Sequence, residues 1–198
     1  MKLLIASKNK DKIAEIKEIL AETELEILSI DDIPPVPDVI ENKETIQENA
    51  IKKAVETAIS ANMHTLADDT GLFVDSLDGR PGVYSARYAG ENCSYEDNRK
   101  KMLQEMKGKE NRKARFKTAV AFASPEGMIA IAEGKVEGQI TEKETGENGF
   151  GYDAIFSADE SGKTFGEMSN EEKHKISHRG RAFRNMLPEI KKYLQNLT

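Results

Sequence analysis

The stretch Leu66 to Asp75, LADDTGLFVD, decides the organisation of the chain, because it joins a buried strand to two adjacent charged side chains. Its start, Thr65 to Ala67, is typical of a strand in a sheet interior, and Asp68 and Asp69 follow just before a glycine. Strand ends in α/β sheets open onto the ligand crevice, so the sequence predicts that this strand ends at the two aspartates, beside a binding site. A β-turn in which an aspartate caps its own backbone would have the same letters.

The segments before this strand alternate between strand and helix patterns. Leu3 to Ala6 is an all-apolar run typical of a buried strand, and apolar residues at helical spacing follow from Ile13 to Leu20. Leu25 to Ile30 is predicted as another strand, and the three prolines of Ile33 to Val39 predict a stiff loop outside the sheet. A second amphipathic helix is predicted from Ile46 to Ile59.

The second half of the chain adds a hairpin and a long helical tail. Arg115 to Ala123 and Met128 to Val136 are β-rich runs joined by the turn sequence SPEG. The polar region from Tyr95 to Arg112 contains a predicted helix and is the expected lobe boundary. Residues 170–197 are predicted to be helical, with a break at Pro188. The order of elements predicts one α/β domain over residues 1–198, with a mixed central sheet flanked by helices.

Composition excludes several classes of protein. The 198 residues are 38% hydrophobic, as in an ordinary globular domain, and no run approaches the length of a membrane helix. The net charge of −6 opposes non-specific binding to nucleic acid or to an anionic membrane. Cys93 is the single cysteine, so no disulfide forms within the chain. We therefore expect a cytoplasmic protein with a small-molecule partner, no nucleic acid and no membrane.

The segment Ser7 to Lys12, SKNKDK, lies where the first predicted strand gives way to the first predicted helix. A helix N-terminus offers free backbone N–H groups and the positive end of the helix dipole, and three lysines add cations. These features suit a phosphate group, although the spacing is not that of a P-loop. An N-capped helix with solvated lysines would have the same sequence.

Asp68 and Asp69 are expected to lie near this phosphate site, which suggests a function for them. Adjacent carboxylates raise one another's pKa unless a cation such as Mg²⁺ or lysine neutralises them. Carboxylates, phosphate donors and Mg²⁺ together indicate phosphoryl chemistry, in which a carboxylate deprotonates or orients water. Glu41 is a further candidate metal ligand, and Lys53 on the second helix is a candidate contact for anionic oxygens; each is otherwise an ordinary surface charge.

Two C-terminal motifs could receive a planar base. The glycines of Gly146 to Asp153, GENGFGYD, allow close backbone approach and present Phe150 for stacking, unless that ring belongs to the core. Further along, Lys173, His178 and Arg179 offer three donors for a phosphate or a base carbonyl, unless they form a solvated basic helix surface. In one continuous helix Lys173 and His178 would not share a face, so a break near Ser177 or Gly180 would bring them together.

Six motifs taken together resemble a known family. They are SKNKDK (7–12), ENAIKKA (48–54), LADDTGL (66–72), PGVYSARYAG (81–90), GFGYDAIF (149–156) and ISHRGRA (176–182). In this order they are similar to the inosine/xanthosine triphosphate pyrophosphatases, and the similarity runs from about Leu3 to Leu187. One segment departs from the family pattern: Glu41 is followed by Asn42 and Lys43, where a glycine is common at the third position, and Ile46 stands where phenylalanine is usual.

The resemblance implies two lobes with the nucleotide in the cleft between them, a homodimer, and Mg²⁺-dependent cleavage of ITP, dITP and XTP to the monophosphate and pyrophosphate. It implies that Asp69 is the catalytic base and that Glu41 and Asp69 bind Mg²⁺ with Asp68 nearby. The implied nucleotide contacts are Ser7, Lys8, Asn9, Lys10, Asp11, Lys12 and Lys53 for the triphosphate, and Thr70, Phe150, Gly151, Tyr152, Asp153, Lys173, His178 and Arg179 for the rest of the molecule, with His178 and Arg179 at the base edge.

The chemistry of the bases fits this selectivity. Hypoxanthine and xanthine carry a carbonyl where adenine carries an amino group, so buried donors at that position would face another donor if adenine entered. Three alternatives remain at this stage: a pyrophosphatase for other modified nucleotides, a regulator that binds nucleotides without hydrolysis, and a single-strand nucleic-acid binder using Phe150, Tyr152 and the basic stretch 107–117, which the acidic balance disfavours.

Overall fold

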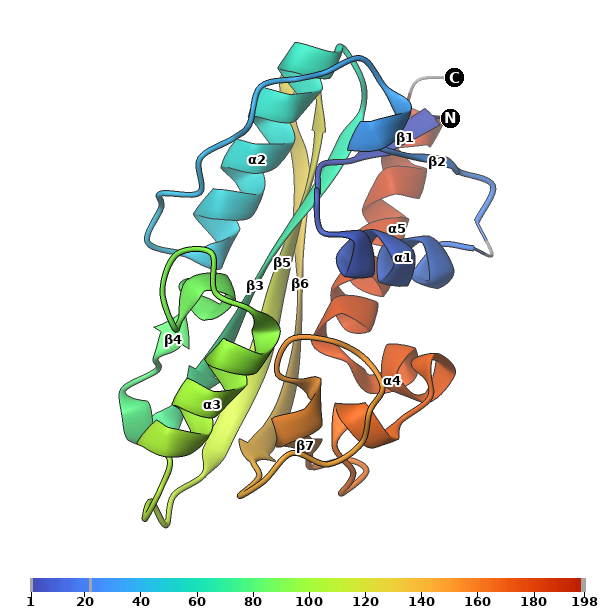
Figure 1. The fold of residues 1–198 in the computed structure, drawn as a ribbon. Helices are drawn as coiled ribbons and strands as arrows, with labels where there is room; N and C mark the ends of the chain where they lie inside the picture. Colours follow the sequence, from blue (N-terminus) through green and yellow to red (C-terminus); the bar gives the residue numbers. More distant parts are fainter. Residues whose placement is uncertain (1, 22, 197–198) are drawn as a thin grey trace. The chain divides into compact units, whose positions relative to one another are not determined.

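The computed structural model (Figure 1) describes residues 2–21 and 23–196. The chain divides into two compact units. The first unit comprises residues 1–69, 118–134 and 179–198, and the second comprises residues 70–117 and 135–178. The predicted lobe boundary at residues 95–112 is wrong, since that region lies wholly inside the second unit. The chain passes from one unit to the other within three long strands and at the start of the last helix, so no linker composition marks the division.

The elements alternate as predicted and build a mixed sheet. Strand order is β2-β1-β3-β5-β6-β7, with β4 paired to β3. β1 is parallel to β2 and β3, whereas β4 and β7 are antiparallel to their partners. The bounds are β1 Lys2–Ile5, α1 Lys10–Ile19, β2 Glu26–Ser29, α2 Ile46–Ala61, β3 Thr65–Val74, β4 Pro81–Gly82, α3 Tyr95–Glu105, β5 Lys113–Ser124, β6 Gly127–Ile140, β7 Phe156–Ala158, α4 Asn170–Ile176 and α5 His178–Gln195.

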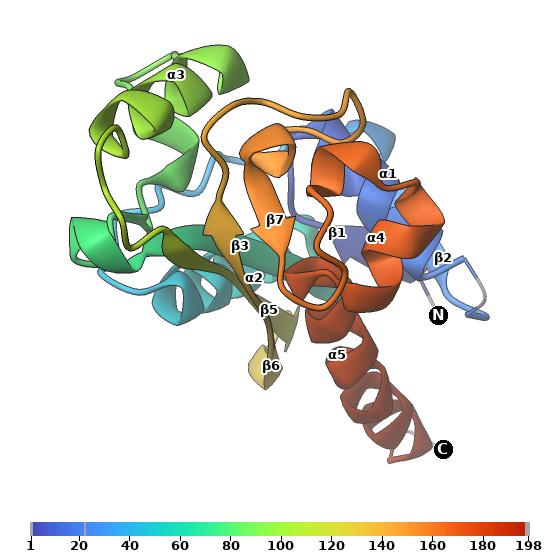
Figure 2. The same cartoon turned by 90° about the horizontal axis from the view of Figure 1, so that it is seen from below.

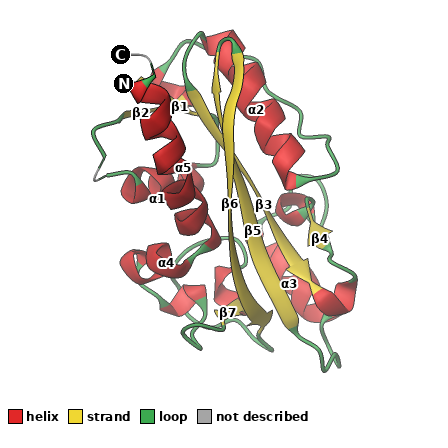
Figure 3. Ribbon diagram, turned by 180° about the vertical axis from the view of Figure 1, so that it is seen from behind, coloured by secondary structure: helices red, strands yellow, loops and turns green. Residues whose placement is uncertain are grey.

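The core of the first unit lies between its strands and two helices. Leu3, Ile5 and Leu66 point to the face covered by α1 and α5, where they meet Ile16 and Phe183. Helix α2 covers the other face (Figure 3) with alanines that are fully buried. Small alanine side chains let the helix approach the strands closely. The sheet of the first unit is therefore buried on both faces, as its all-apolar strand sequences predict.

Strand β3 is longer than predicted. It continues through Asp68 and Asp69 to Val74, because β4 pairs with its second half at Leu72 and Phe73. Its parallel neighbour β1 pairs with it only as far as Leu66. The two aspartates are therefore in mid-strand, just beyond the point where the neighbouring strand stops.

The C-terminal helices also differ from the prediction. The chain breaks at Ser177, whose backbone is extended between α4 and α5, and α5 then runs without interruption through Pro188. A proline inside a helix removes one backbone hydrogen bond and costs about 3 kcal/mol. Buried Phe183, Met186 and Ile190 anchor α5 on both sides of this position, and we attribute the continuity of the helix to that packing.

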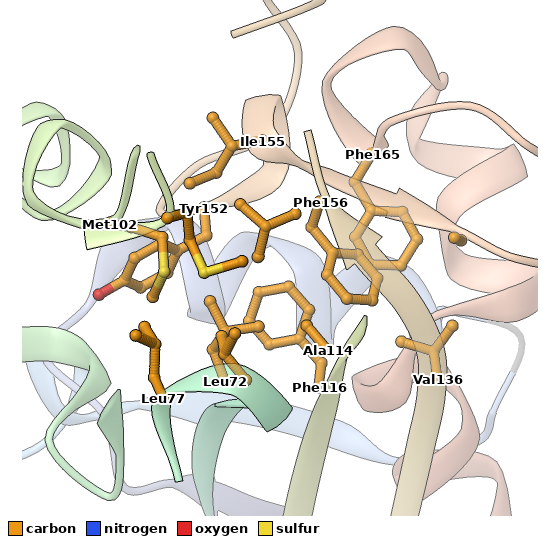
Figure 4. Packing of buried hydrophobic residues seen from close by; sticks show 14 of the residues in the cluster. Leu72, Leu77, Met102, Ala114, Phe116, Val136, Tyr152, Ile155, Phe156 and Phe165 are labelled. Atoms are coloured by element: carbon orange, nitrogen blue, oxygen red, sulfur yellow. The ribbon is translucent and has the colours of Figure 1, made fainter. Parts of the chain in front are cut away.

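The second unit has its own aromatic core (Figure 4). Phe116 of β5 packs edge-on against Phe156, with ring centroids 4.7 Å apart, and its ring plane is nearly parallel to that of Phe165. The loop before β7 is tied to both α3 and the segment before α4 (Figure 2): Arg99 donates to the carbonyl of Gly151 at 3.0 Å, and Asn148 donates to the carbonyl of Met168 at 3.0 Å. Among the residues described, no helix is long and apolar enough to cross a membrane.

Candidate active site

The predicted phosphate segment lies at the junction of β1 and α1. Asn9 caps the helix, its Oδ1 accepting from the backbone N–H groups of Asp11 and Lys12 at 3.0 and 3.2 Å. Ser7 in turn accepts from the N–H of Asn9 at 3.2 Å. Lys8 forms an ion pair with Asp38 of the proline-rich loop. The N-capped helix and the row of cations are therefore both present, and they are compatible with each other.

Asp68 and Asp69 point to opposite faces of the sheet, because successive side chains of a strand alternate. Asp68 points to the α1 and α5 face, where its Oδ2 lies 3.1 Å from Lys12 Nζ and 3.4 Å from Arg179 Nε. Asp69 points to the α2 face, where its Oδ2 accepts from Asn49 Nδ2 at 3.1 Å. The sequence predicted that the two carboxylates act side by side. In the structure they lie on opposite faces of the strand and contact different residues.

Asp68 is the centre of a buried network of charges. Its side chain is fully buried, and Arg179, only 2% exposed, also forms an ion pair with Glu15 of α1. Burial favours the neutral carboxyl, but the charges of Lys12, Arg179 and Lys53 outweigh it and hold the pKa of Asp68 well below its ordinary value. Asp68 is therefore a permanent counter-ion within the first unit.

Glu41 and Lys53 form a second ion pair in the same unit. Burial opposes the charge on Lys53, yet Asp68, Glu41 and Asp69 together raise its pKa above the ordinary value. The Lys53 ammonium is therefore stabilised by the same three carboxylates that were predicted from the sequence as metal ligands. Asn49 and Lys53, four positions apart on α2, share one helix face.

These oxygen donors fit Mg²⁺ of the kind that is bound together with a phosphate substrate. Within residues 2–21 and 23–196, no three His, Cys, Asp or Glu side chains are grouped as a ready-made metal site. Mg²⁺ usually binds through one or two carboxylates and the substrate's phosphates and keeps several waters, so it needs no such cage. Glu41, which is paired with Lys53, and Asp69, which accepts from Asn49, are the candidate carboxylates for such a site. Asp68 is fully buried and is paired with two cations on the other face of the sheet.

The second unit holds the predicted base-binding residues other than Arg179. Lys173 Nζ lies 2.7 Å from Asp153 Oδ2, and the two side chains are only 4% and 6% exposed. The same carboxylate oxygen accepts from the N–H of Phe150 at 2.8 Å. The Lys173 ammonium also lies 4.9 Å from the centre of the Phe150 ring, within cation–π range. Gly149 adopts φ +73°, and a Cβ there would lie 2.1 Å from Asp153 Oδ2, so the tight loop requires glycine.

The neighbouring residues of this unit are held by ring stacking and backbone contacts. His178 stacks on Phe116, with ring centroids 4.4 Å apart and planes inclined by 13°. Tyr152 donates from its hydroxyl to the carbonyl of Ser85 at 2.8 Å, and burial raises the pKa of this phenol far above its ordinary value. Thr70 is half-buried on β3 and is the first residue of the second unit.

The structure thus brings the predicted site residues into two groups. Arg179 belongs to the first unit with Glu15 and Asp68, although the sequence grouped it with Lys173 and His178. The chain does break at Ser177, one of the two positions where a break would help Lys173 and His178 to come together. Asn49 and Glu15 were missed; the signal for Asn49 was available, since it is a polar residue among apolar neighbours on the buried face of α2.

Comparisons with known proteins agree with this architecture. A sequence model described as the Ham1 family matches residues 3–189. The "dITP/XTP pyrophosphatase" of Thermoanaerobacter sp. is 46% identical over 197 residues, covering 98% of this chain and 99% of its own. The protein of the same name from Desulfotalea psychrophila is 42% identical over 196 residues, covering 98% of this chain and 88% of its own.

Solved structures give the same result. The Staphylococcus aureus Ham1 protein superposes with a TM-score of 0.84 at 38% identity, and the match covers both chains completely. A HAM1 protein from Coxiella burnetii gives a TM-score of 0.87 at 34% identity, covering 97% of this chain and 99% of its own. The fold and these matches define an α/β protein of the nucleoside-triphosphate pyrophosphatase type. The chain belongs to the Ham1 family.

Proposed function

We propose that the chain hydrolyses non-standard purine nucleoside triphosphates, namely ITP, dITP and XTP, to the monophosphate and pyrophosphate, and so removes them from the nucleotide pool. The observation that carries this proposal is the charged group of the first unit. Asp69, Glu41 and Lys53 combine a candidate base, oxygen donors for a divalent metal and a cation for phosphate. The names of the relatives support the same substrate class.

In the proposed reaction the residues of the first unit act on the triphosphate. The N-terminus of α1 and the lysines at positions 8, 10, 12 and 53 hold its oxygens. Asp69 accepts a proton from the water that attacks the α-phosphorus, the α–β anhydride bond breaks, and pyrophosphate leaves. Mg²⁺ held by Glu41, Asp69 and phosphate oxygens would offset the negative charge that develops on those oxygens.

The residues of the second unit would receive the base. Phe150 offers a ring for stacking, and Lys173 is held beside it by Asp153. Lys173 is a donor, and His178 can donate through a ring N–H, so both suit the carbonyl of hypoxanthine or xanthine and would leave the amino group of adenine facing another donor. Arg179 would support the triphosphate side through Asp68 and Glu15, in place of the base edge.

The remaining expectations belong to this proposal as well. The protein would work in the cytoplasm as a homodimer. A pyrophosphatase for other modified nucleotides would use the same phosphate residues with a different base preference. A regulator that only binds nucleotides would not need Asp69, Glu41 and Lys53 together.

Product analysis tests the proposal. The purified chain is incubated with ITP, XTP, dITP, GTP, ATP and dUTP, with and without Mg²⁺, and pyrophosphate and orthophosphate are assayed separately. We expect pyrophosphate from ITP, XTP and dITP, little from ATP and GTP, and none without metal. Orthophosphate as the direct product, or no turnover, would contradict the role given to Asp69. Preference for dUTP would point to a different base.

A further inference from the structure

Three side chains on one face of α2 hold the loop that carries Glu41. Asn49, Lys52 and Lys53 are three and four positions apart, so they point the same way. Lys52 donates to the carbonyl of Ile40 at 2.8 Å and to Asn42 Oδ1 at 2.9 Å. Lys53 forms an ion pair with Glu41.

Asn49 differs from the two lysines because it contacts two partners at once. Its Oδ1 accepts from the backbone N–H of Lys43 at 2.9 Å, and its Nδ2 donates to Asp69 Oδ2 at 3.1 Å. The side chain is buried, with 2% of its surface exposed. A buried amide held at both ends has a single orientation, so it links the Glu41 loop to the strand that carries Asp69.

The contact with Lys43 decides which end of the amide faces Asp69. A backbone N–H can only donate, so the Asn49 atom that meets it must be the oxygen. The nitrogen is then turned to Asp69, and it presents a hydrogen-bond donor to that carboxylate. The hydrogen bond from Asn49 Nδ2 holds Oδ2 of Asp69 in place and so sets the orientation of the whole carboxylate.

We infer that Asn49 is a positioning residue for Asp69, which sets the orientation of the catalytic carboxylate and its spacing from Glu41. This inference rests on the proposed function, in which Asp69 is the base. Outer-shell residues that hold a carboxylate ligand typically change activity or metal affinity by about 10- to 100-fold when replaced. Asn49 acts through Asp69 and does not need to touch the nucleotide.

Two substitutions at one position separate positioning from loop anchoring. Asn49→Asp keeps an oxygen for the Lys43 N–H and replaces the donor facing Asp69 with a negative charge. Asn49→Ala removes both contacts. Lys52→Ala is the matched control, because it releases the same loop from the same helix face and has no contact with Asp69.

The measurements are kcat and KM for dITP, binding of a non-hydrolysable dITP analogue by calorimetry, and thermal unfolding. We expect both Asn49 variants to lose about 10- to 100-fold in kcat with less than about threefold change in analogue binding. Lys52→Ala should lose less than about fivefold, as for a surface contact.

Two outcomes would overturn the inference. Wild-type kcat in Asn49→Asp would show that Asn49 only anchors the loop. Equal losses in Asn49→Ala and Lys52→Ala, matched by equal losses of thermal stability, would show the same. A wild-type protein without dITP turnover, or a fully active Asp69→Asn variant, would overturn the proposed function instead, so the two failures are distinguishable.

Discussion

The first and second units use charge in different ways. In the first unit Lys12 and Arg179 pair with Asp68, Arg179 also pairs with Glu15, and Lys53 pairs with Glu41. In the second unit, Lys173 and Asp153 form a buried ion pair that lies against aromatic rings. The cations of the network in the first unit can bind the oxygens of a triphosphate in place of the carboxylates. A lysine held beside an aromatic ring can instead donate a hydrogen bond to a base that stacks on the ring. The difference predicts separate effects on catalysis and on base selection.

The largest expected effect concerns Asp69. Asp69→Asn keeps the shape of the side chain and removes the proton acceptor, so kcat for dITP should fall by about 10²- to 10⁴-fold. Calorimetry should show binding of a non-hydrolysable analogue close to that of the wild type. Full turnover would take the base role away from Asp69 and would remove the functional contrast between the aspartates at positions 68 and 69.

The next effect concerns the stability of the first unit. Asp68→Asn removes the shared partner of Lys12 and Arg179, and breaking a buried pair in this way costs about 3–5 kcal/mol of unfolding free energy. Urea denaturation measures it. Lys8→Met, which removes the exposed pair with Asp38, is the control and should cost less than about 1 kcal/mol. Equal stabilities of the two variants would show that the buried network does not support the unit.

A smaller effect is expected at Phe150 of the second unit. Stacking of a base on an aromatic ring is worth about 1–3 kcal/mol. Phe150→Ala should therefore raise KM by roughly 5- to 150-fold for dITP and for dATP alike, with kcat nearly unchanged. Phe150→Tyr keeps the ring and serves as the control. A loss confined to kcat would mean that the ring belongs to the catalytic group.

The smallest effect concerns an exposed pair of the second unit, Arg115 with Glu137. Burial opposes ionisation of Glu137, but Arg115 and Lys135 lower its pKa below the ordinary value of 4.5. A lowered pKa in the folded state means that the stabilisation is present above the ordinary value and is lost as the pH falls through the folded value. Glu137→Gln should cost less than about 1 kcal/mol at pH 7, and the difference should vanish in acid. A constant difference from pH 7 to pH 3 in urea titrations would contradict the assignment.

Local patterns predicted most of the fold. The helix of residues 10–19 and the hairpin of β5 and β6 follow from apolar spacing and a four-residue turn, which need no distant partner. The length of β3 could not be predicted in this way, because its second half is stabilised by pairing with β4. The break predicted at Pro188 was wrong for the same reason. The free-energy cost of the proline is local, whereas the packing that stabilises α5 comes from residues far away in sequence.

The arrangement of the candidate site could be predicted only in parts. Ser7 to Lys12 and the loop before Asp153 lie where the motifs indicated, since both depend on neighbouring residues. Arg179 finds Glu15 across 164 positions, a pairing that a single sequence does not reveal. Asp68 and Asp69 point to opposite faces because side chains alternate along a strand. The sequence did not predict this, because the strand was expected to end at the two aspartates.

One measurement tests the division of tasks between the two units directly. The ratio of kcat/KM for dITP over dATP is measured in the wild type, in Lys53→Met of the first unit and in Lys173→Met of the second. Each ratio comes from a single preparation, so partial unfolding cancels. The account predicts that Lys53→Met lowers both values and leaves the ratio unchanged, while Lys173→Met brings the ratio towards one. A ratio that falls in Lys53→Met and survives in Lys173→Met would contradict it.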